Sequence, residues 1–243
     1  MTNPVLTAAA VLPALYLLYC IYQADRVEKE PAGLLISLAI SGIIATFLAM
    51  MAESVGYLLV SSVFWEGSIL YNFFFYFFVV ALSEEGFKYL LLKKRTWNSP
   101  AFNCRFDGVV YAVFVSLGFA LWENISYVGM YGMQVAILRA VTAIPGHACF
   151  GVFMGVWYGL AKKFDLYGND EKANRYCKLA VLFPVLLHGS YDFIAAMENS
   201  WFTLVFIVFI AVMFWISYPI RIVTVFKIPS SAVYEISFQS LPV

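Results

Sequence analysis

Residues 69–92 read ILYNFFFYFFVVALSEEGFKYLLL, an apolar run that is interrupted by two adjacent glutamates and a lysine. The run is long enough to cross a bilayer as a helix, because about 20 apolar residues suffice. Ionised side chains at membrane depth cost roughly 3 kcal/mol each on insertion scales. We therefore expect Glu84, Glu85 and Lys88 to face a protein interior or a wet cavity rather than lipid.

The spacing of these three residues places them on one face of a helix. Glu84 and Lys88 are four residues apart, and Glu85 and Lys88 are three apart, so either carboxylate can pair with the ammonium group. Paired carboxylates in a poor solvent, one of them neutralised by a cation, are typical of general acids and bases. The stretch is therefore a candidate catalytic centre.

The composition of the whole chain indicates an integral membrane protein. Of its 243 residues, 63% are hydrophobic and 12% are charged, whereas a soluble domain carries about 25% charged residues. Acidic and basic residues balance at 15 each, and no basic face or tail indicates a nucleic-acid partner. We expect four free thiols, with Cys20 and Cys149 in apolar runs and Cys104 and Cys177 in short loops, because their spacing is scattered.

Hydropathy predicts an all-α, polytopic transmembrane bundle of about seven spans. The expected ranges are 5–22, 33–52, 69–92, 106–128, 135–161, 179–197 and 201–220. The apolar part of residues 53–68 is too short to span, so we expect an outer-face loop or a shallow interfacial helix there. We expect one transmembrane helical domain over residues 1–226, with a protease core at about 69–197, and a flexible cytoplasmic tail at 227–243.

The basic residues predict how this bundle is oriented. Thirteen of the fifteen Lys and Arg residues fall after the first, third and fifth expected spans and in the tail. Because loops rich in basic residues stay in the cytoplasm, we expect the N-terminus outside and the C-terminus inside. The two exceptions, Lys88 and Arg139, lie inside expected spans, which makes both of them candidates for a functional role.

Polar residues also interrupt the fourth and fifth expected spans. Glu123 is either an interfacial residue at a helix end or a carboxylate that faces the bundle interior. His147 follows Pro145 near the middle of the next span, where proline can kink a helix and free a backbone carbonyl. Glycines at steps of four follow it and predict close helix packing; they are Gly151, Gly155 and Gly159.

The sixth expected span contains the second histidine of the chain. His188 and Asp192 lie one helical turn apart, so the aspartate can orient the imidazole, or both can ligate a metal. A bundle that turns all of these groups inward suits a water activated by a base, with or without a metal. The chain contains neither Gly-x-Ser-x-Gly nor His-Glu-x-x-His, and no pair of intramembrane aspartates in Gly-Asp contexts.

Three motifs, in this order, resemble those of the PrsW family of intramembrane proteases. Glu84-Glu85-Gly-Phe-Lys88 is similar to the family's Glu-Glu-x-x-Lys, Phe119-Ala-Leu-Trp-Glu123 to its Phe-x-x-x-Glu, and His188-Gly-Ser-Tyr-Asp192 to its His-x-x-x-Asp. The resemblance covers residues 71–192. The distantly related CAAX prenyl endopeptidases have histidine where this chain has Glu123, and this difference favours a metal site of histidines and a carboxylate.

The resemblance implies an intramembrane endopeptidase of the bacterial cell membrane. Such a protease makes the first cut in a single-pass, membrane-anchored anti-sigma factor during a stress response. The implied roles are Glu84 or Glu85 as general base with the other carboxylate beside Lys88, Asp192 as the residue that orients His188, and Glu123, His147 and His188 as ligands of Zn²⁺ or as groups that polarise the scissile carbonyl.

Three other functions are compatible with the same residues. An ion- or proton-coupled transporter can use intramembrane Glu, His and Lys as a relay, although the chain has no visible repeated halves. A protease of prenylated proteins and a membrane scaffold without catalysis are the remaining alternatives.

Overall fold

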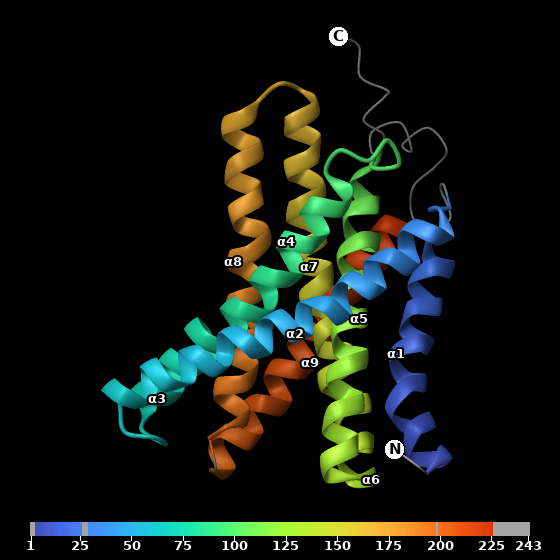
Figure 1. Ribbon diagram of the computed structural model, residues 1–243. Helices are drawn as coiled ribbons and strands as arrows, with labels where there is room; N and C mark the ends of the chain where they lie inside the picture. Colours follow the sequence, from blue (N-terminus) through green and yellow to red (C-terminus); the bar gives the residue numbers. More distant parts are fainter. Residues whose placement is uncertain (1–2, 26–28, 198, 226–243) are drawn as a thin grey trace.

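The structure is a computed structural model that describes residues 3–25, 29–197 and 199–225, with side chains up to residue 216. Within these ranges it is a helical bundle without strands, which confirms the all-α fold (Figure 1). The elements are α1 (Pro4–Ala24), α2 (Ala32–Val63), α3 (Ile69–Phe74), the π-helical segment η1 (Phe75–Ala81), α4 (Leu82–Thr96), α5 (Arg105–Tyr131), α6 (Met133–Val141), α7 (Ala143–Leu166), α8 (Asp170–Ala195) and α9 (Ser200–Val225).

Six segments of the described chain are long and apolar enough to cross a membrane. They are α1, α2, the continuous run α3–η1–α4, α5, the pair α6–α7, and α8. The fully described part of α9, Ser200–Ile216, is apolar but shorter. A polytopic membrane bundle is thus confirmed, and the seventh span stays a prediction.

The expectation of a loop or interfacial helix at residues 53–68 was wrong for most of that segment. Helix α2 continues without a break to Val63, so its 32 residues exceed the length that a perpendicular span requires. At 1.5 Å per residue the helix is about 48 Å long, and it runs obliquely across the bundle (Figure 1). A tilted helix accommodates a longer apolar stretch, so hydropathy placed the end of this helix too early.

The helix that contains the sixth expected span begins nine residues before residue 179, because α8 starts at Asp170. Asn169 caps this helix by accepting a hydrogen bond from the backbone N–H of Lys172. The first turns of α8 are polar, with Arg175 exposed, and a hydropathy pattern does not detect such turns. Cys177 is therefore buried within a helix rather than in a loop, although all four cysteines are free thiols as expected.

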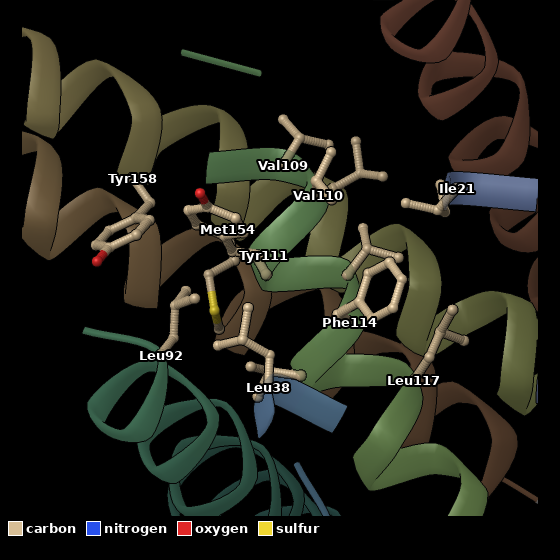
Figure 2. Close-up of a cluster of buried hydrophobic side chains, with 14 of the residues drawn as sticks. Ile21, Leu38, Leu92, Val109, Val110, Tyr111, Phe114, Leu117, Met154 and Tyr158 are labelled. Atoms are coloured by element: carbon tan, nitrogen blue, oxygen red, sulfur yellow. The ribbon is translucent and has the colours of Figure 1, made fainter. Parts of the chain in front are cut away.

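Helix α5 lies at the centre of the bundle. All of its residues from Phe106 to Ala120 are buried, and it packs against α7, α2 and α1. Figure 2 shows Phe114 and Leu117 of α5 in one buried cluster with Leu38 of α2 and Met154 of α7. Because α5 is surrounded, a charged residue on it is costly unless neighbouring helices provide a partner.

Glycines permit the close contacts of α5 with its neighbours. A Cβ atom at Gly118 would lie 2.1 Å from the carbonyl oxygen of Ala39 on α2, and one at Gly155 of α7 would lie 2.4 Å from the Cα of Val109. The predicted packing role of the glycines spaced by four on α7 is thereby confirmed.

Successive connections between the spans lie at alternate ends of the bundle, as the distribution of basic residues predicts. The α4–α5 connection and the α7–α8 turn lie at one end of the bundle, whereas the start of α1 and the end of α8 lie at the other (Figure 1). The orientation in the membrane stays a prediction. Arg26 and the expected tail at residues 227–243 lie outside the described residues.

Candidate active site

The Glu-Glu-x-x-Lys stretch forms the beginning of α4, directly after the π-helical segment η1. A π-helical turn widens the helix and changes the direction of the side chains that follow it, and such turns are frequent at functional sites. Glu84, Glu85 and Lys88 are all buried, and Lys88 and Glu85 are fully inaccessible. The expectation that these charges face the protein interior is confirmed.

Lys88 is the centre of a hydrogen-bond network. Its Nζ donates to Glu85 Oε1 at 2.8 Å and to Glu84 Oε2 at 3.2 Å, as the helical spacing predicted. It also lies 3.1 Å from Nδ1 of His147 on α7 and 3.9 Å from the centre of the Phe119 ring. One ammonium group thus connects both carboxylates of the motif with an imidazole that lies 59 residues further along the chain.

The two histidines occupy matching positions in this network. His188 Nδ1 lies 2.8 Å from Glu85 Oε1, and its Nε2 lies 3.3 Å from Asp192 Oδ2. His147 turns Nδ1 toward Lys88, and its Nε2 lies 2.9 Å from Glu123 Oε2. Each imidazole therefore directs Nδ1 at the motif on α4 and Nε2 at a separate carboxylate. The two rings are 5.2 Å apart.

Glu123 is tied to a second cation, Arg139 of α6. The guanidinium donates from Nη2 to Glu123 Oε2 at 2.7 Å and from Nε to the side-chain oxygen of Asn124 at 3.1 Å. Asn124 in turn donates to the backbone carbonyl of Ala10 on α1. Arg139 was a candidate for a functional role because it is a charged residue in an expected span, and Glu123 is its ion-pair partner.

Four of these side chains could hold a metal ion. Glu84, Glu85, His147 and His188 offer one ligand atom each within 4.8 Å of one another, and carboxylate and imidazole are ligand types of catalytic zinc. Glu85 Oε2 is buried and has no hydrogen-bond partner among the described residues, which is costly unless a cation or a donor satisfies it. The residues therefore fit a divalent metal, whereas Glu123 lies outside this group of four.

A cavity of about 480 Å³ opens beside this cluster. Its charged lining consists of Glu84, Glu123, Arg139 and Asp192 together with Glu53 of α2, and both histidines also line it. Glu53 was not among the residues predicted from the sequence, because it follows directly after an expected span that ends at residue 52. The only signal was a carboxylate directly after an apolar run.

The site contains more negative than positive groups. Five carboxylates, Glu85 and the four that line the cavity, are present with two permanent cations, Lys88 and Arg139. If all were ionised and the histidines neutral, the excess would be three negative charges. A low-dielectric interior requires protons or a further cation to balance such an excess.

A cavity inside a polytopic helical bundle, lined by carboxylates and imidazoles, defines a membrane-embedded site for acid–base or metal-assisted hydrolysis. The chain belongs to the PrsW family of intramembrane metalloproteases, because the family model, described as PrsW family intramembrane metalloprotease, matches residues 30–218. The resemblance seen in the three motifs is thereby confirmed, and the protein is a multi-pass bacterial membrane protease.

Curated relatives support this assignment over most of the chain. The Protease PrsW of Oceanobacillus iheyensis is 39% identical over 209 residues, which cover 86% of this chain and 90% of the relative. The protein of the same name from Clostridioides difficile is 35% identical over 86% of this chain and 86% of its own. That from Bacillus subtilis is 32% identical over 84% of this chain and 89% of its own. No solved structure matches.

Proposed function

We propose that this protease hydrolyses a peptide bond of a single-pass, membrane-anchored substrate such as an anti-sigma factor, and that Glu84 is the general base. The observation that carries the assignment of the base is the difference between the two glutamates. Glu84 lines the cavity together with His147 and His188, whereas Glu85 is fully buried and does not line it. A base has to reach the water whose proton it accepts.

Glu85, His147 and His188 would hold the metal, which we propose to be Zn²⁺. When bound, zinc supplies Lewis acidity that polarises the scissile carbonyl and activates water. Asp192 and Glu123 would orient His188 and His147 through Nε2, as carboxylates do for metal-bound histidines in other proteins. The role predicted for Glu123 as a direct ligand stays a prediction, which the metal content of Glu123→Gln tests.

In this proposal the side chains of Glu84 and Lys88 on α4 have different roles. The Glu84 carboxylate accepts a proton from water in the cavity and returns it to the leaving amine when the peptide bond breaks. Lys88 holds both glutamates in place through its Nζ, at 2.8 Å from Glu85 and 3.2 Å from Glu84. It also keeps positive charge beside the place where the substrate carbonyl gains negative charge.

The test combines cleavage with metal analysis. The wild type is co-expressed with a tagged, membrane-anchored anti-sigma factor, blots detect the shortened fragment, and the metal content of the purified full-length protein is measured. We expect a fragment and one divalent metal per chain with the wild type, and neither with His188→Ala. A wild type that cleaves no single-pass substrate but moves ions or protons across vesicles would contradict the proposal in favour of a transporter.

A further inference from the structure

A second cavity, of about 560 Å³, adjoins the 480 Å³ cavity beside Glu84 and His188, which we call the catalytic cavity. Both are in the volume range of ligand-binding pockets. They have five lining residues in common, which are Tyr127, Tyr131, Arg139, Ala143 and Tyr191. The two cavities are therefore neighbours that share one wall.

The second cavity, which we name the apolar cleft, is lined by seven apolar side chains, by three tyrosines and two threonines that also present apolar surface, and by Arg139. Its apolar lining includes Val135 and Leu138 of α6, Ile194 of α8 and Phe206 of α9. Of the described residues around it, Arg139 alone is charged, and its guanidinium is already paired with Glu123. Burial of apolar surface is thus the interaction that the cleft offers to an occupant.

Aromatic rings connect the apolar cleft with the catalytic residues. The Tyr191 ring lies 5.0 Å from that of Phe206 in the cleft and 6.1 Å from that of Phe150. Phe150 stacks on the catalytic His188 at 4.8 Å. These contacts span only three ring-to-ring steps, and an extended peptide advances about 3.3 Å per residue. A few residues of substrate therefore reach from the cleft to the cluster.

The helix break beside the cleft leaves one helical backbone hydrogen bond unmade. Helix α6 ends at Val141, α7 begins at Ala143, and Thr142 between them lines the cleft. Pro145 has no N–H, so the carbonyl of Val141 lacks the donor that a continuous helix would provide. A peptide N–H can donate to such a carbonyl, whereas a lipid acyl chain cannot.

We propose that the apolar cleft binds an extended, apolar stretch of the membrane-anchored substrate directly beside the scissile bond, while that bond lies in the catalytic cavity. This inference rests on the proposed protease function. In this inference the cleft determines which substrate side chains are accepted beside the scissile bond. Substrates with large apolar residues beside that bond are therefore preferred. Phe206 and Leu138 would form the two walls that contact those side chains.

Photo-crosslinking tests the occupant without requiring cleavage. The photoreactive residue p-benzoylphenylalanine replaces Leu138, which lines the cleft, or its neighbour Ile137, which does not; the two are 59% and 63% exposed. Both are placed in full-length Glu84→Gln protein in vesicles with a tagged single-pass substrate that the wild type cleaves. We expect the substrate cross-link to be at least about tenfold stronger at position 138. Equal cross-links, or a phospholipid adduct at 138 instead, would overturn the inference.

A matched pair of space-filling variants tests the selectivity. Thr203→Trp fills the cleft from α9, whereas Val208→Trp adds a comparable side chain to the same exposed helix away from the cleft. We expect Thr203→Trp to lower kcat/KM about tenfold or more, since one excess methylene in a pocket already has that effect. Substrates with Ala or Gly beside the cut should restore it. Loss with every substrate, or equal loss in Val208→Trp, would contradict the inference while leaving the wild-type protease activity in place.

Discussion

The substitutions Glu84→Gln and Glu85→Gln separate the two glutamates by their effects on rate and on stability. Each glutamine keeps the shape of the side chain but cannot take up a proton as a carboxylate does. For Glu84, the loss of a general base lowers kcat by about 10²–10⁴-fold. Because each tenfold change corresponds to 1.36 kcal/mol, this range raises the barrier by about 3 to 5 kcal/mol.

The contacts of the two carboxylates predict that Glu85→Gln lowers stability more than Glu84→Gln does. Glu85 Oε1 lies 2.8 Å from both Lys88 and His188, and its side chain is inaccessible. Glu84 Oε2 makes one longer contact with Lys88, at 3.2 Å, and lies 3.8 Å from His188. Breaking a buried ion pair costs about 3 kcal/mol or more, equivalent to about 6–12 °C of melting temperature in a chain of this size.

We therefore expect Glu84→Gln to be well folded and nearly inactive, and Glu85→Gln to melt several degrees lower and to lose metal. The assay follows cleavage of the tagged substrate in vesicles, thermal unfolding and metal content for each purified protein. Glu66→Gln is the control, since it makes the same change at an exposed carboxylate away from the cavity. This carboxylate accepts a hydrogen bond from the hydroxyl of Tyr57.

Two results would refute this reasoning. If Glu84→Gln cleaves at the wild-type rate while Glu85→Gln is folded, retains its metal and is inactive, then Glu85 is the base and access to the cavity does not decide which glutamate takes that role. If both variants fold normally and cleave at the wild-type rate, the start of α4 is not the catalytic centre.

Three further predictions concern the metal, the packing and the topology. His188→Ala should remove the metal and the activity together, and a stoichiometric metal in this variant would contradict the ligand assignment. Gly118→Ala should destabilise the protein by about 1–3 kcal/mol, because its Cβ would overlap α2, whereas Gly86→Ala, with open space around it, should be neutral or stabilising by up to about 1 kcal/mol in thermal unfolding. Reporter fusions after Glu66 and after Lys163 should lie on opposite sides of the membrane, and finding both on one side would rule out the alternating topology.

Local periodicity was sufficient to predict part of this site. Glu84, Glu85 and Lys88 share a helix face because a helix repeats every 3.6 residues, and His188 and Asp192 meet for the same reason. The helical membrane bundle followed from apolar length alone. These features depend on neighbours along the chain, so they can be read without knowledge of the fold.

The packing of helices decided the remainder of the site. Lys88 reaches His147 across 59 residues and Glu85 reaches His188 across 103, because α8 packs against both α4 and α7. Glu53 enters the cavity only because α2 is tilted and longer than one perpendicular span. Helix tilt and the choice of facing surfaces depend on many small contacts between distant segments, which no local pattern encodes.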